Sequence, residues 1–410
     1  MKFLFCSLSN HGLIYPSIGI AQVLSQRGHE VAFVTGSAFS KTLSQAGIER
    51  HFCTLENDLG FQIWNWGEES AIILQVKQIE YALNNFVPDV LVGQQLTLGP
   101  LIAAECHGLP VGILGLAAYL WPICESLLEH LPESEKERRL VWRYEETMEN
   151  YNQVRKQIGL PQNHANYRET PLLGDAFLLQ SVPELETDAN MLPEKVHLIG
   201  SCLWEPFLFD VELVRWLTKF YASTDPLIYV QPGRSFQDPR FWPHLVDALG
   251  DCPVRVVASI GRMDGELGVI PKNFFVRNHI PQGFVLPKAQ AVISSGHTTA
   301  VLGALTHGLP SLLFPYGSGT EDIAERCQQV GAAICLSPSE ITAEKLRLAV
   351  DKLLNCSSLR YNAQTLQKAF ANINGLQQAA DSLESLAVNR RPVLRSLSEL
   401  DSYVYSSNPK

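Results

Sequence analysis

Short apolar runs alternate with amphipathic segments along the first 120 residues of the chain. Four runs have the length and content of buried strands: KFLFCSL (2–8), HEVAFVTG (29–36), PDVLVGQ (88–94) and LPVGILGL (109–116). Between them, PSIGIAQVLSQRG (16–28) and LGPLIAAECHG (98–108) place apolar residues at helical spacing, and each ends at a glycine. This alternation predicts βαβ units and therefore a parallel sheet with helices on both faces.

A second series of the same kind begins at Pro226. Its predicted strands are PLIYVQPG (226–233), CPVRVVASI (252–260), NFFVRNHI (273–280), AQAVISS (289–295) and LPSLLFP (309–315). The predicted fold class is therefore α/β, with two Rossmann-like doubly wound parallel-sheet domains facing a cleft. We expect an N-terminal domain, a linker and hinge, a C-terminal domain and a tail, over residues 1–202, 203–225, 226–385 and 386–410.

The net charge and the cysteine spacing exclude several classes of function. The 410 residues carry a formal net charge of −10, which disfavours nucleic acid or an anionic membrane as the main partner. The nine cysteines form no CxxC pair and no short His-Cys cluster, so we expect reduced thiols and no metal site. The longest apolar stretch, 109–124, is interrupted by prolines and glycines and is too short to span a bilayer. We expect a soluble cytoplasmic protein with small-molecule partners; its oligomeric state stays open.

The turn Ser295-Gly296-His297-Thr298-Thr299 lies between a predicted strand and a predicted helix and is suited to an anion. Gly296 allows a ligand to approach the backbone closely. Thr298 and Thr299 open the helix, whose unpaired N–H groups attract phosphate without a lysine. An ordinary capped helix start is the alternative. The turn is not a Walker loop, because no GKS or GKT follows.

The segment around this turn resembles a known signature. NHIPQGFVLPKAQAVISSGHTTAVLGALTHGLPSLLFP (278–315) resembles the donor-binding signature of nucleotide-sugar-dependent glycosyltransferases of the two-Rossmann (GT-B) class. Within that class it is most similar to the group with plant, macrolide and glycopeptide antibiotic glycosyltransferases. YPSIGIAQVLSQRGHEVAFVT (15–35) resembles the first helix and second strand of the same family. The resemblance implies an acceptor site in the N-terminal domain, a nucleotide sugar such as a UDP-sugar as co-substrate in the C-terminal domain, and no metal or other cofactor.

The resemblance assigns donor binding to a set of C-terminal residues: Gly233, Arg234, His279, Ile280, Gln282, Ser295, Gly296, His297, Thr298, Thr299, Gly319 and Thr320. Several of them depart from the family pattern. Ser295 stands where the family has a histidine at the diphosphate, and Gly303 stands where a glutamate holds the ribose. Gly319 and Thr320 replace the Asp-Gln pair that binds the sugar.

Three residues are candidates to replace the lost donor contacts. Arg234 follows a glycine where the family prefers Ser or Thr, and its guanidinium suits a diphosphate; His297 is a second candidate. A solvated loop arginine and a solvent-facing histidine are the alternatives. His279 takes the place of the aromatic that stacks on the nucleobase, with the Ile280 backbone beside the base; a plain strand-end histidine is the alternative.

The catalytic dyad of the family is also changed. The positions of its histidine and aspartate are Leu13 and Gln94, so we expect these two residues to line the acceptor site without acting as a base. His11 lies two residues earlier and is the candidate catalytic base; a loop histidine that caps the first helix is the alternative. Four aromatics are expected on the acceptor side, at least one of them as plain core: Trp64, Trp66, Tyr119 and Trp121.

These features predict an inverting glycosyltransferase that moves a sugar from a nucleoside diphosphate sugar to a small natural-product acceptor. The alternative is a catalytically degenerate glycosyltransferase-like binding or auxiliary protein, which the joint loss of the dyad and of the donor contacts favours. A third possibility is an enzyme that kept the diphosphate site and changed its reaction.

Overall fold

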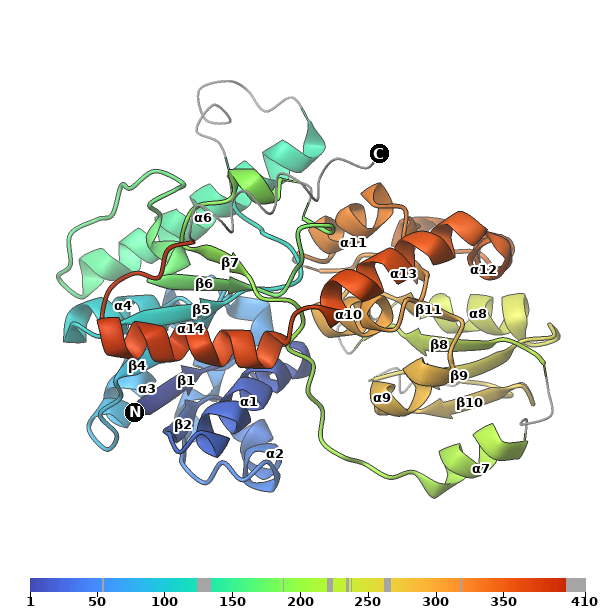
Figure 1. The fold of residues 1–410 in the computed structure, drawn as a ribbon, viewed down its shortest axis with the longest axis horizontal. Helices are drawn as coiled ribbons and strands as arrows, with labels where there is room; N and C mark the ends of the chain where they lie inside the picture. Colours follow the sequence, from blue (N-terminus) through green and yellow to red (C-terminus); the bar gives the residue numbers. More distant parts are fainter. Residues whose placement is uncertain are drawn as a thin grey trace. The chain divides into compact units, whose positions relative to one another are not determined.

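The computed structural model describes residues 1–53, 55–123, 134–186, 188–219, 224–233, 236, 238–261, 267–317 and 319–395, with the backbone alone for 55–57. The chain divides into two compact units (Figure 1). The first unit contains Met1–Trp204 and Ile373–Lys410, and the second contains Glu205–Asn372. Within the described residues, no helix is both long enough and apolar enough to cross a bilayer.

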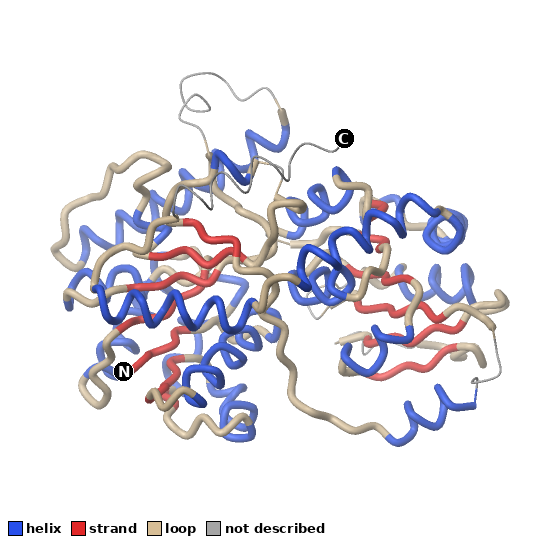
Figure 2. Tube along the Cα trace, viewed as in Figure 1, coloured by secondary structure: helices blue, strands red, loops and turns tan. Residues whose placement is uncertain are grey.

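The first unit is built on a seven-stranded parallel sheet in the order β3-β2-β1-β4-β5-β6-β7. The strands are β1 (Lys2–Cys6), β2 (Glu30–Val34), β3 (His51–Phe52), β4 (Val90–Gln94), β5 (Val111–Leu114), β6 (Ala176–Leu179) and β7 (Val196–Leu198). In the central strands nearly every residue is buried. This is typical of a parallel sheet covered by helices on both faces (Figure 2).

Helices of the first unit follow the predicted alternation. They are α1 (His11–Gln26), α2 (Ser40–Gln45), α3 (Glu69–Leu83), α4 (Gly99–His107), α6 (Glu135–Gln157) and α14 (Gly375–Asn389), with 3₁₀ turns at Ser37–Phe39, Leu55–Phe61, Ile63–Asn65, Pro171–Leu173 and Ala189–Met191. A capping box starts α6: the Glu137 N–H donates to Ser134 Oγ over 3.1 Å, and the Ser134 N–H donates to Glu137 Oε2 over 3.0 Å. The charge-rich segment Glu135–Gln157 is therefore a capped helix.

The position of α14 corrects the predicted domain boundary. Residues 375–385 were expected in the C-terminal domain, but α14 packs on the sheet of the first unit, and its Leu383 and Leu386 belong to that unit's core. A Cβ at Gly112 of β5 would lie 2.6 Å from Leu383 Cδ2, so this glycine allows the helix to sit close to the strand. The linker and hinge over 203–225 stay a prediction.

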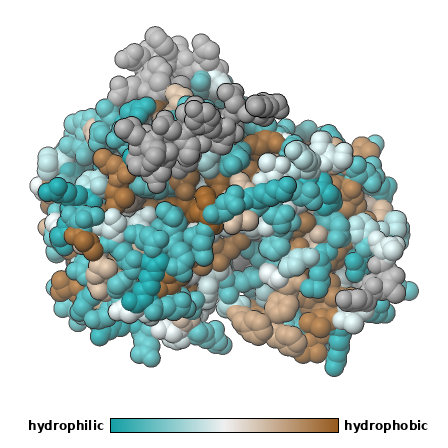
Figure 3. Space-filling model, in the orientation of Figure 1, coloured by the Kyte–Doolittle hydropathy of each residue, from teal (hydrophilic) through white to brown (hydrophobic). Residues whose placement is uncertain are grey.

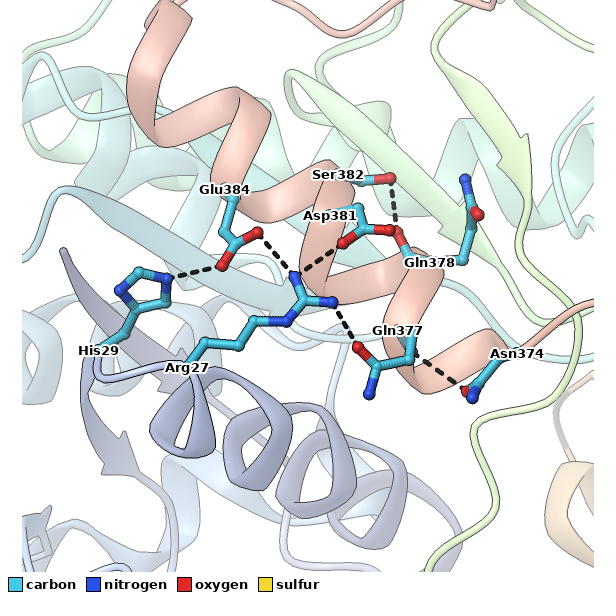
Figure 4. A network of polar contacts seen from close by, with 8 residues as sticks. All are labelled: Arg27, His29, Asn374, Gln377, Gln378, Asp381, Ser382 and Glu384. Carbon is cyan, nitrogen blue, oxygen red and sulfur yellow. Dashed lines mark hydrogen bonds and ion pairs between the residues drawn. The ribbon is translucent and has the colours of Figure 1, made fainter.

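Polar contacts also hold α14 on the first unit (Figure 4). Arg27, at the end of α1, lies 2.7 Å from both Asp381 and Glu384. His29 Nε2 lies 2.6 Å from the other oxygen of Glu384. Arg27 also donates to Gln377. One arginine and one histidine thus bind two successive turns of α14.

The second unit is built on a six-stranded parallel sheet in the order β10-β9-β8-β11-β12-β13. The strands are β8 (Leu227–Gln231), β9 (Arg255–Ser259), β10 (Phe274–Arg277), β11 (Ala291–Ser294), β12 (Ser311–Leu313) and β13 (Ala333–Cys335). The helices are α7 (Val211–Lys219), α8 (Phe241–Leu249), α9 (Gln282–Val285), α10 (Thr298–Thr306), α11 (Thr320–Gln329), α12 (Ala343–Asn355) and α13 (Ser357–Ala371), with 3₁₀ turns at Leu286–Lys288 and Pro338–Glu340. The two sheets confirm the predicted class of two doubly wound α/β units.

Two cores cover the two faces of the second sheet. Ile228 and Val230 of β8 belong to the core under α8 and α12, whereas Leu227 and Tyr229 belong to the core on the opposite face. This alternation follows from the period of two along a strand. Some apolar side chains stay exposed at the start of the unit, above all Phe207 at 82% and Phe209 at 61%. Figure 3 shows apolar residues, tan to brown, at the lower edge of this unit.

Candidate functional site

The strand order of the second unit locates a ligand site. The first strand, β8, pairs with β9 on one side and with β11 on the other. Chain connections therefore leave β8 and β11 in different directions at their carboxyl ends, which is where doubly wound sheets bind ligands. Gly233 follows β8, and Ser295 to Thr299 follow β11. These predicted donor-site residues thus lie at the switch point of the sheet.

Contacts between the two loops bring these residues together. A Cβ at Gly233 would lie 2.4 Å from His297 Cδ2 and 3.3 Å from Ser295 Oγ, and the φ of Gly233 is +85°. Only glycine fits this backbone at this distance from the imidazole. The buried hydroxyl of Ser295 donates to the carbonyl oxygen of Pro232. Ser295 therefore joins the two loops, and its hydroxyl is already occupied within the protein.

The loop after β12 borders the same turn. Gly296 has a φ of +83°, and a Cβ there would lie 3.1 Å from the carbonyl oxygen of Thr320. Gly319, with a φ of +80°, is the N-cap of α11, and the buried Thr320 hydroxyl donates to the Gly317 carbonyl over 2.7 Å. The positions predicted for the sugar therefore lie beside the turn predicted for the diphosphate.

His297 is the N-cap residue of α10, but its side chain makes no capping hydrogen bond to that helix. Burial lowers the pKa of His297 to about 4, so the imidazole is neutral near pH 7. A neutral imidazole can donate a hydrogen bond to a phosphate but supplies no positive charge. Thr298 is buried, Thr299 is partly buried, and the first turn of α10 holds no acidic residue.

A pocket of about 440 Å³ lies at the carboxyl ends of β9 and β10. It is lined by Ile260, Leu267, Ile270, Val276, Arg277, Asn278 and His279. His279 is exposed, as a base-stacking residue must be, and the volume lies within the usual range for small-molecule sites. Its walls combine four aliphatic side chains with three polar ones.

Ile280 is tied into the core beside this pocket. Its N–H donates to Ser259 Oγ over 3.1 Å, and its carbonyl oxygen accepts from Tyr229 OH over 3.0 Å. The side chain is buried in the core on that face. The N–H of Ile280 is therefore occupied, and only the second lone pair of its carbonyl remains for a base.

Glu205 is a carboxylate of this region that sequence reasoning missed. Its two oxygens accept from the backbone N–H groups of Gln282 over 3.0 Å and Gly283 over 2.7 Å. Burial raises the pKa of Glu205, while these two hydrogen bonds oppose the shift. Within the predicted linker, nothing in the sequence distinguishes Glu205 from an ordinary surface residue.

Gln282 reaches toward Gly303. A Cβ at Gly303 would lie 2.7 Å from Gln282 Oε1 and 2.9 Å from Leu286 Cδ1. The place where the family has a glutamate is therefore occupied by the Gln282 side chain. Arg234, the predicted charged contact, lies outside the described residues.

The first unit has its own switch point, between β1 and β4, and Gln94 lies there as the last residue of β4. Gln94 is 2% exposed. Its Oε1 accepts from the Leu8 N–H over 3.0 Å, and its Nε2 donates to Ser7 Oγ, Leu13 O and Ser17 Oγ over 2.8, 2.6 and 3.1 Å. Gln94 thus anchors the loop between β1 and α1, and the buried Leu13 is one of its partners.

His11 is the first residue of α1. The cap of this helix is Asn10, whose side chain accepts from the Gly12 N–H over 2.9 Å, so His11 is not the capping residue. Its ring meets the rings of Tyr15 and Phe39 edge to face, with centroid distances of 5.0 and 4.9 Å. The imidazole is partly buried and held between two aromatic rings at the carboxyl edge of the sheet.

The four predicted aromatics fall into two groups. Trp64 is 68% exposed and Trp66 is partly buried, both around a 3₁₀ turn. Tyr119 and Trp121 are buried: the Tyr119 ring lies 5.8 Å from Phe177 and the Trp121 ring 6.4 Å from Tyr144. The expectation that some of these residues are core therefore holds for Tyr119 and Trp121.

Comparison with known proteins gives one family match, over residues 243–386, to the C-terminal domain described as Erythromycin biosynthesis protein CIII-like. The chain is 25% identical to 4'-demethylrebeccamycin synthase of Lentzea aerocolonigenes, covering 94% of this chain and 99% of that protein. It is 23% identical to the NDP-glycosyltransferase YjiC of Bacillus subtilis (strain 168), covering 92% and 94%. The solved structure of the calicheamicin glycosyltransferase CalG4 has a TM-score of 0.70 at 21% identity, covering 95% and 98% of the two chains.

Proposed function

We propose that the chain is a glycosyltransferase enzyme of the GT-B class, in the group with the antibiotic glycosyltransferases, and that it uses a nucleoside diphosphate sugar. The sugar is transferred to a small natural-product acceptor, with inversion at the anomeric carbon. The observation that supports this most is the meeting of Gly233, Gly296 and Thr320 at the carboxyl edge of the second sheet. The relative described as an NDP-glycosyltransferase supports the same class of donor.

The diphosphate is proposed to bind at the start of α10. The missing Cβ atoms at Gly233 and Gly296 let the loops after β8 and β12 pack against this turn, and the backbone N–H groups at the start of α10 would bind the phosphate oxygens. The positive end of the α10 dipole attracts the same oxygens. With His297 neutral, Arg234 is the proposed source of positive charge. No metal is expected in this arrangement.

The pocket beside His279 is the proposed site of the nucleobase. The exposed imidazole of His279 would stack on one face of the base, and the aliphatic side chains of the lining would cover the rest. The sugar would then lie near Gly319 and Thr320. These two residues offer fewer hydrogen-bonding groups than the Asp-Gln pair of the family, which favours a deoxysugar.

His11 is proposed as the catalytic base. The acceptor hydroxyl oxygen forms a bond to the anomeric carbon while the bond from that carbon to the diphosphate oxygen breaks. The hydroxyl proton passes to the imidazole of His11, and the nucleoside diphosphate leaves with the electron pair. General-base help of this kind contributes a factor of about 10²–10⁴ in rate. The rings of Tyr15 and Phe39 would hold the imidazole in place.

A second candidate function rests on Gln94. Because both ends of its amide are bound within the protein, the position of the family's aspartate has become a structural anchor. This favours a protein that binds the nucleotide sugar or acceptor without transferring the sugar. The protein could still catalyse transfer with Gln94 as an anchor if its acceptor needs no base, as is the case for a carboxylate or an amine.

The two candidate functions, a transferase and a binding protein, are distinguished by whether the sugar is transferred. The protein is first screened by thermal shift against UDP- and dTDP-sugars, and the donors that stabilise it are incubated with hydroxyl, amine and carboxylate acceptors. Mass spectrometry then detects the glycosylated product. A stabilising donor with a product supports the proposed function, while a stabilising donor without any product supports the binding protein. A protein that no nucleotide sugar stabilises and that forms no product contradicts both.

A further inference from the structure

Five buried polar side chains belong to the loops that follow β4, β5 and β6 in the first unit. They are Gln95, Thr97, Tyr119, Gln180 and Ser181, and none is more than 2% exposed. Among the described residues, one polar atom of each meets no hydrogen-bond partner: Gln95 Nε2, Thr97 Oγ1, Tyr119 OH, Gln180 Oε1 and Ser181 Oγ. None of them belongs to the anchor around Gln94.

Hydrogen bonds to the backbone place two of these side chains, Gln95 and Gln180, against one segment. Gln95 Oε1 accepts from the Leu116 N–H over 3.0 Å, and Gln180 Nε2 donates to the Gly115 carbonyl over 2.7 Å. The Gln180 N–H donates to the Leu116 carbonyl over 3.0 Å. Both amides are therefore fixed at one end by residues 115–116, and their other ends remain unused. Tyr119 follows three residues later in the same segment.

Thr97 and Ser181 extend the set along the neighbouring loops. Thr97 lies two residues after Gln95, where its N–H donates to the Gln94 carbonyl in a tight turn. Ser181 directly follows Gln180. The five residues thus lie in the loops that leave β4, β5 and β6. These three strands are neighbours in the sheet (Figure 1).

Buried polar atoms without partners are rare because each one destabilises the folded protein. Five in one region of a sheet edge, in a fold whose ligands bind at that edge, call for a ligand that supplies the missing partners. Proteins accept such a loss of stability where the groups are needed for function.

The chemistry of the set defines the ligand. One amide group is a donor, the other an acceptor, and three hydroxyls act as either. None of the five carries a charge at neutral pH: burial, and then Tyr144 and Glu186, raise the pKa of Tyr119. Tyr119 lies near charges of both signs, the Glu186 carboxylate and the Arg168 guanidinium, so these two charges favour neither a cationic nor an anionic ligand. Hydroxyl groups, which donate and accept at once, complement this set best.

We propose that these five side chains bind a neutral acceptor with several hydroxyl groups, such as a sugar, a glycosylated compound or a cyclitol. The inference rests on the proposed glycosyl transfer and names the class of acceptor. A purely apolar acceptor would leave these buried polar atoms without partners.

Isosteric variants test the proposal. Tyr119→Phe and Thr97→Val each remove one partnerless hydroxyl and keep the shape of the side chain. Their matched controls are Tyr151→Phe and Thr170→Val, which are equally buried but whose hydroxyls have partners: Arg155 donates to Tyr151 OH, and the Leu172 N–H donates to Thr170 Oγ1. The probes are methyl glucoside and myo-inositol as polyols and 1-octanol as an apolar acceptor.

We expect the two test variants to unfold at the wild-type temperature or above it, because they lose no internal hydrogen bond. The KM for the polyol that is used should rise by up to about tenfold, the effect of one lost neutral hydrogen bond, with kcat little changed. The control variants should unfold at a lower temperature and keep the wild-type KM.

Two results overturn the proposal when at least one acceptor is glycosylated. The first is a Tyr119→Phe variant that unfolds earlier, as its control does, and that keeps the wild-type KM for the polyol. The second is transfer to 1-octanol but to neither polyol, which would leave the glycosyltransferase activity intact and refute the class of acceptor. If no acceptor is glycosylated, the proposed function fails instead. In that case the melting temperature is measured with each of the two polyols and no donor. A rise in the melting temperature of wild type that is absent in Tyr119→Phe supports the site, and no rise in wild type refutes it.

Discussion

Replacing Gln94 by leucine should loosen the loop between β1 and α1 by a predictable amount. The substitution keeps the size of the side chain and removes both ends of its amide. The buried N–H of Leu8 then loses its partner, Gln94 Oε1 at 3.0 Å. Ser7 and Ser17 lose less, because their hydroxyls still donate to the carbonyls of Leu8 over 3.2 Å and Leu13 over 3.3 Å.

One orphaned buried N–H costs about 1–3 kcal/mol, so we expect about 2 kcal/mol from Gln94→Leu. A chain with two compact units need not unfold in one step, so a local measurement is better suited than a global free energy of unfolding. Amide hydrogen exchange reports the opening of the loop itself. A loss of about 2 kcal/mol makes exchange at Leu8 about 30-fold faster.

The matched control is Gln26→Leu, on the exposed face of α1, which should stay within about 0.5 kcal/mol of wild type. Exchange is followed by mass spectrometry on peptides from the first strand and α1. If Leu8 exchanges in Gln94→Leu at the wild-type rate, the amide is not the anchor of the loop. The interpretation of the lost dyad as a structural replacement would then be wrong.

Three further predictions concern the candidate site. His11→Ala should lower turnover of a hydroxyl acceptor by about 10² or more with nearly unchanged donor affinity. Turnover at the wild-type rate would exclude His11 as the base. Adding Leu13→His and Gln94→Asp to the His11→Ala variant rebuilds the dyad of the family and tests whether activity recovers. Arg234→Ala should weaken nucleoside diphosphate binding tenfold or more, since a charge-assisted hydrogen bond is worth about 1.5–3 kcal/mol, and unchanged affinity by calorimetry would exclude this contact. Because the pKa of His297 falls from 6.5 to about 4 on folding, the unfolded chain binds the extra proton between these values. The stability that His297 contributes should therefore be present above pH 6.5 and be lost as the pH falls toward 4. The melting temperature of wild type should drop more between these pH values than that of His297→Asn. Parallel curves of melting temperature against pH for the two proteins would refute the lowered pKa of His297.

The alternation of apolar runs predicted the two sheets because each strand is short, buried and locally encoded. The placement of α14 was not predictable in this way. Its amphipathic pattern shows that one face is buried but not which sheet it covers, and the boundary drawn at 385 was wrong for that reason. The close approach of Leu383 to Gly112, and the ion pairs with Arg27, join residues more than 250 positions apart.

The candidate site was predictable where it depends on strand ends. Gly233 and Gly296 meet because both follow strands at the switch point, and the strand pattern places those ends. Contacts between side chains from distant segments were not predictable. Examples are Glu205 on the N–H groups of Gln282 and Gly283, and the use of the Gln94 amide as an anchor of the loop between β1 and α1.

Calorimetric titration of a nucleoside diphosphate into wild type and Gly233→Ala tests the central claim most directly. A methyl group at Gly233 would lie 2.4 Å from the His297 ring, at a φ of +85° that alanine disfavours, so the turn that receives the diphosphate must shift. The account predicts that wild type binds UDP or dTDP and that Gly233→Ala binds it at least about tenfold more weakly. Equal affinity in the two proteins, or no binding of either nucleotide by wild type, would contradict it.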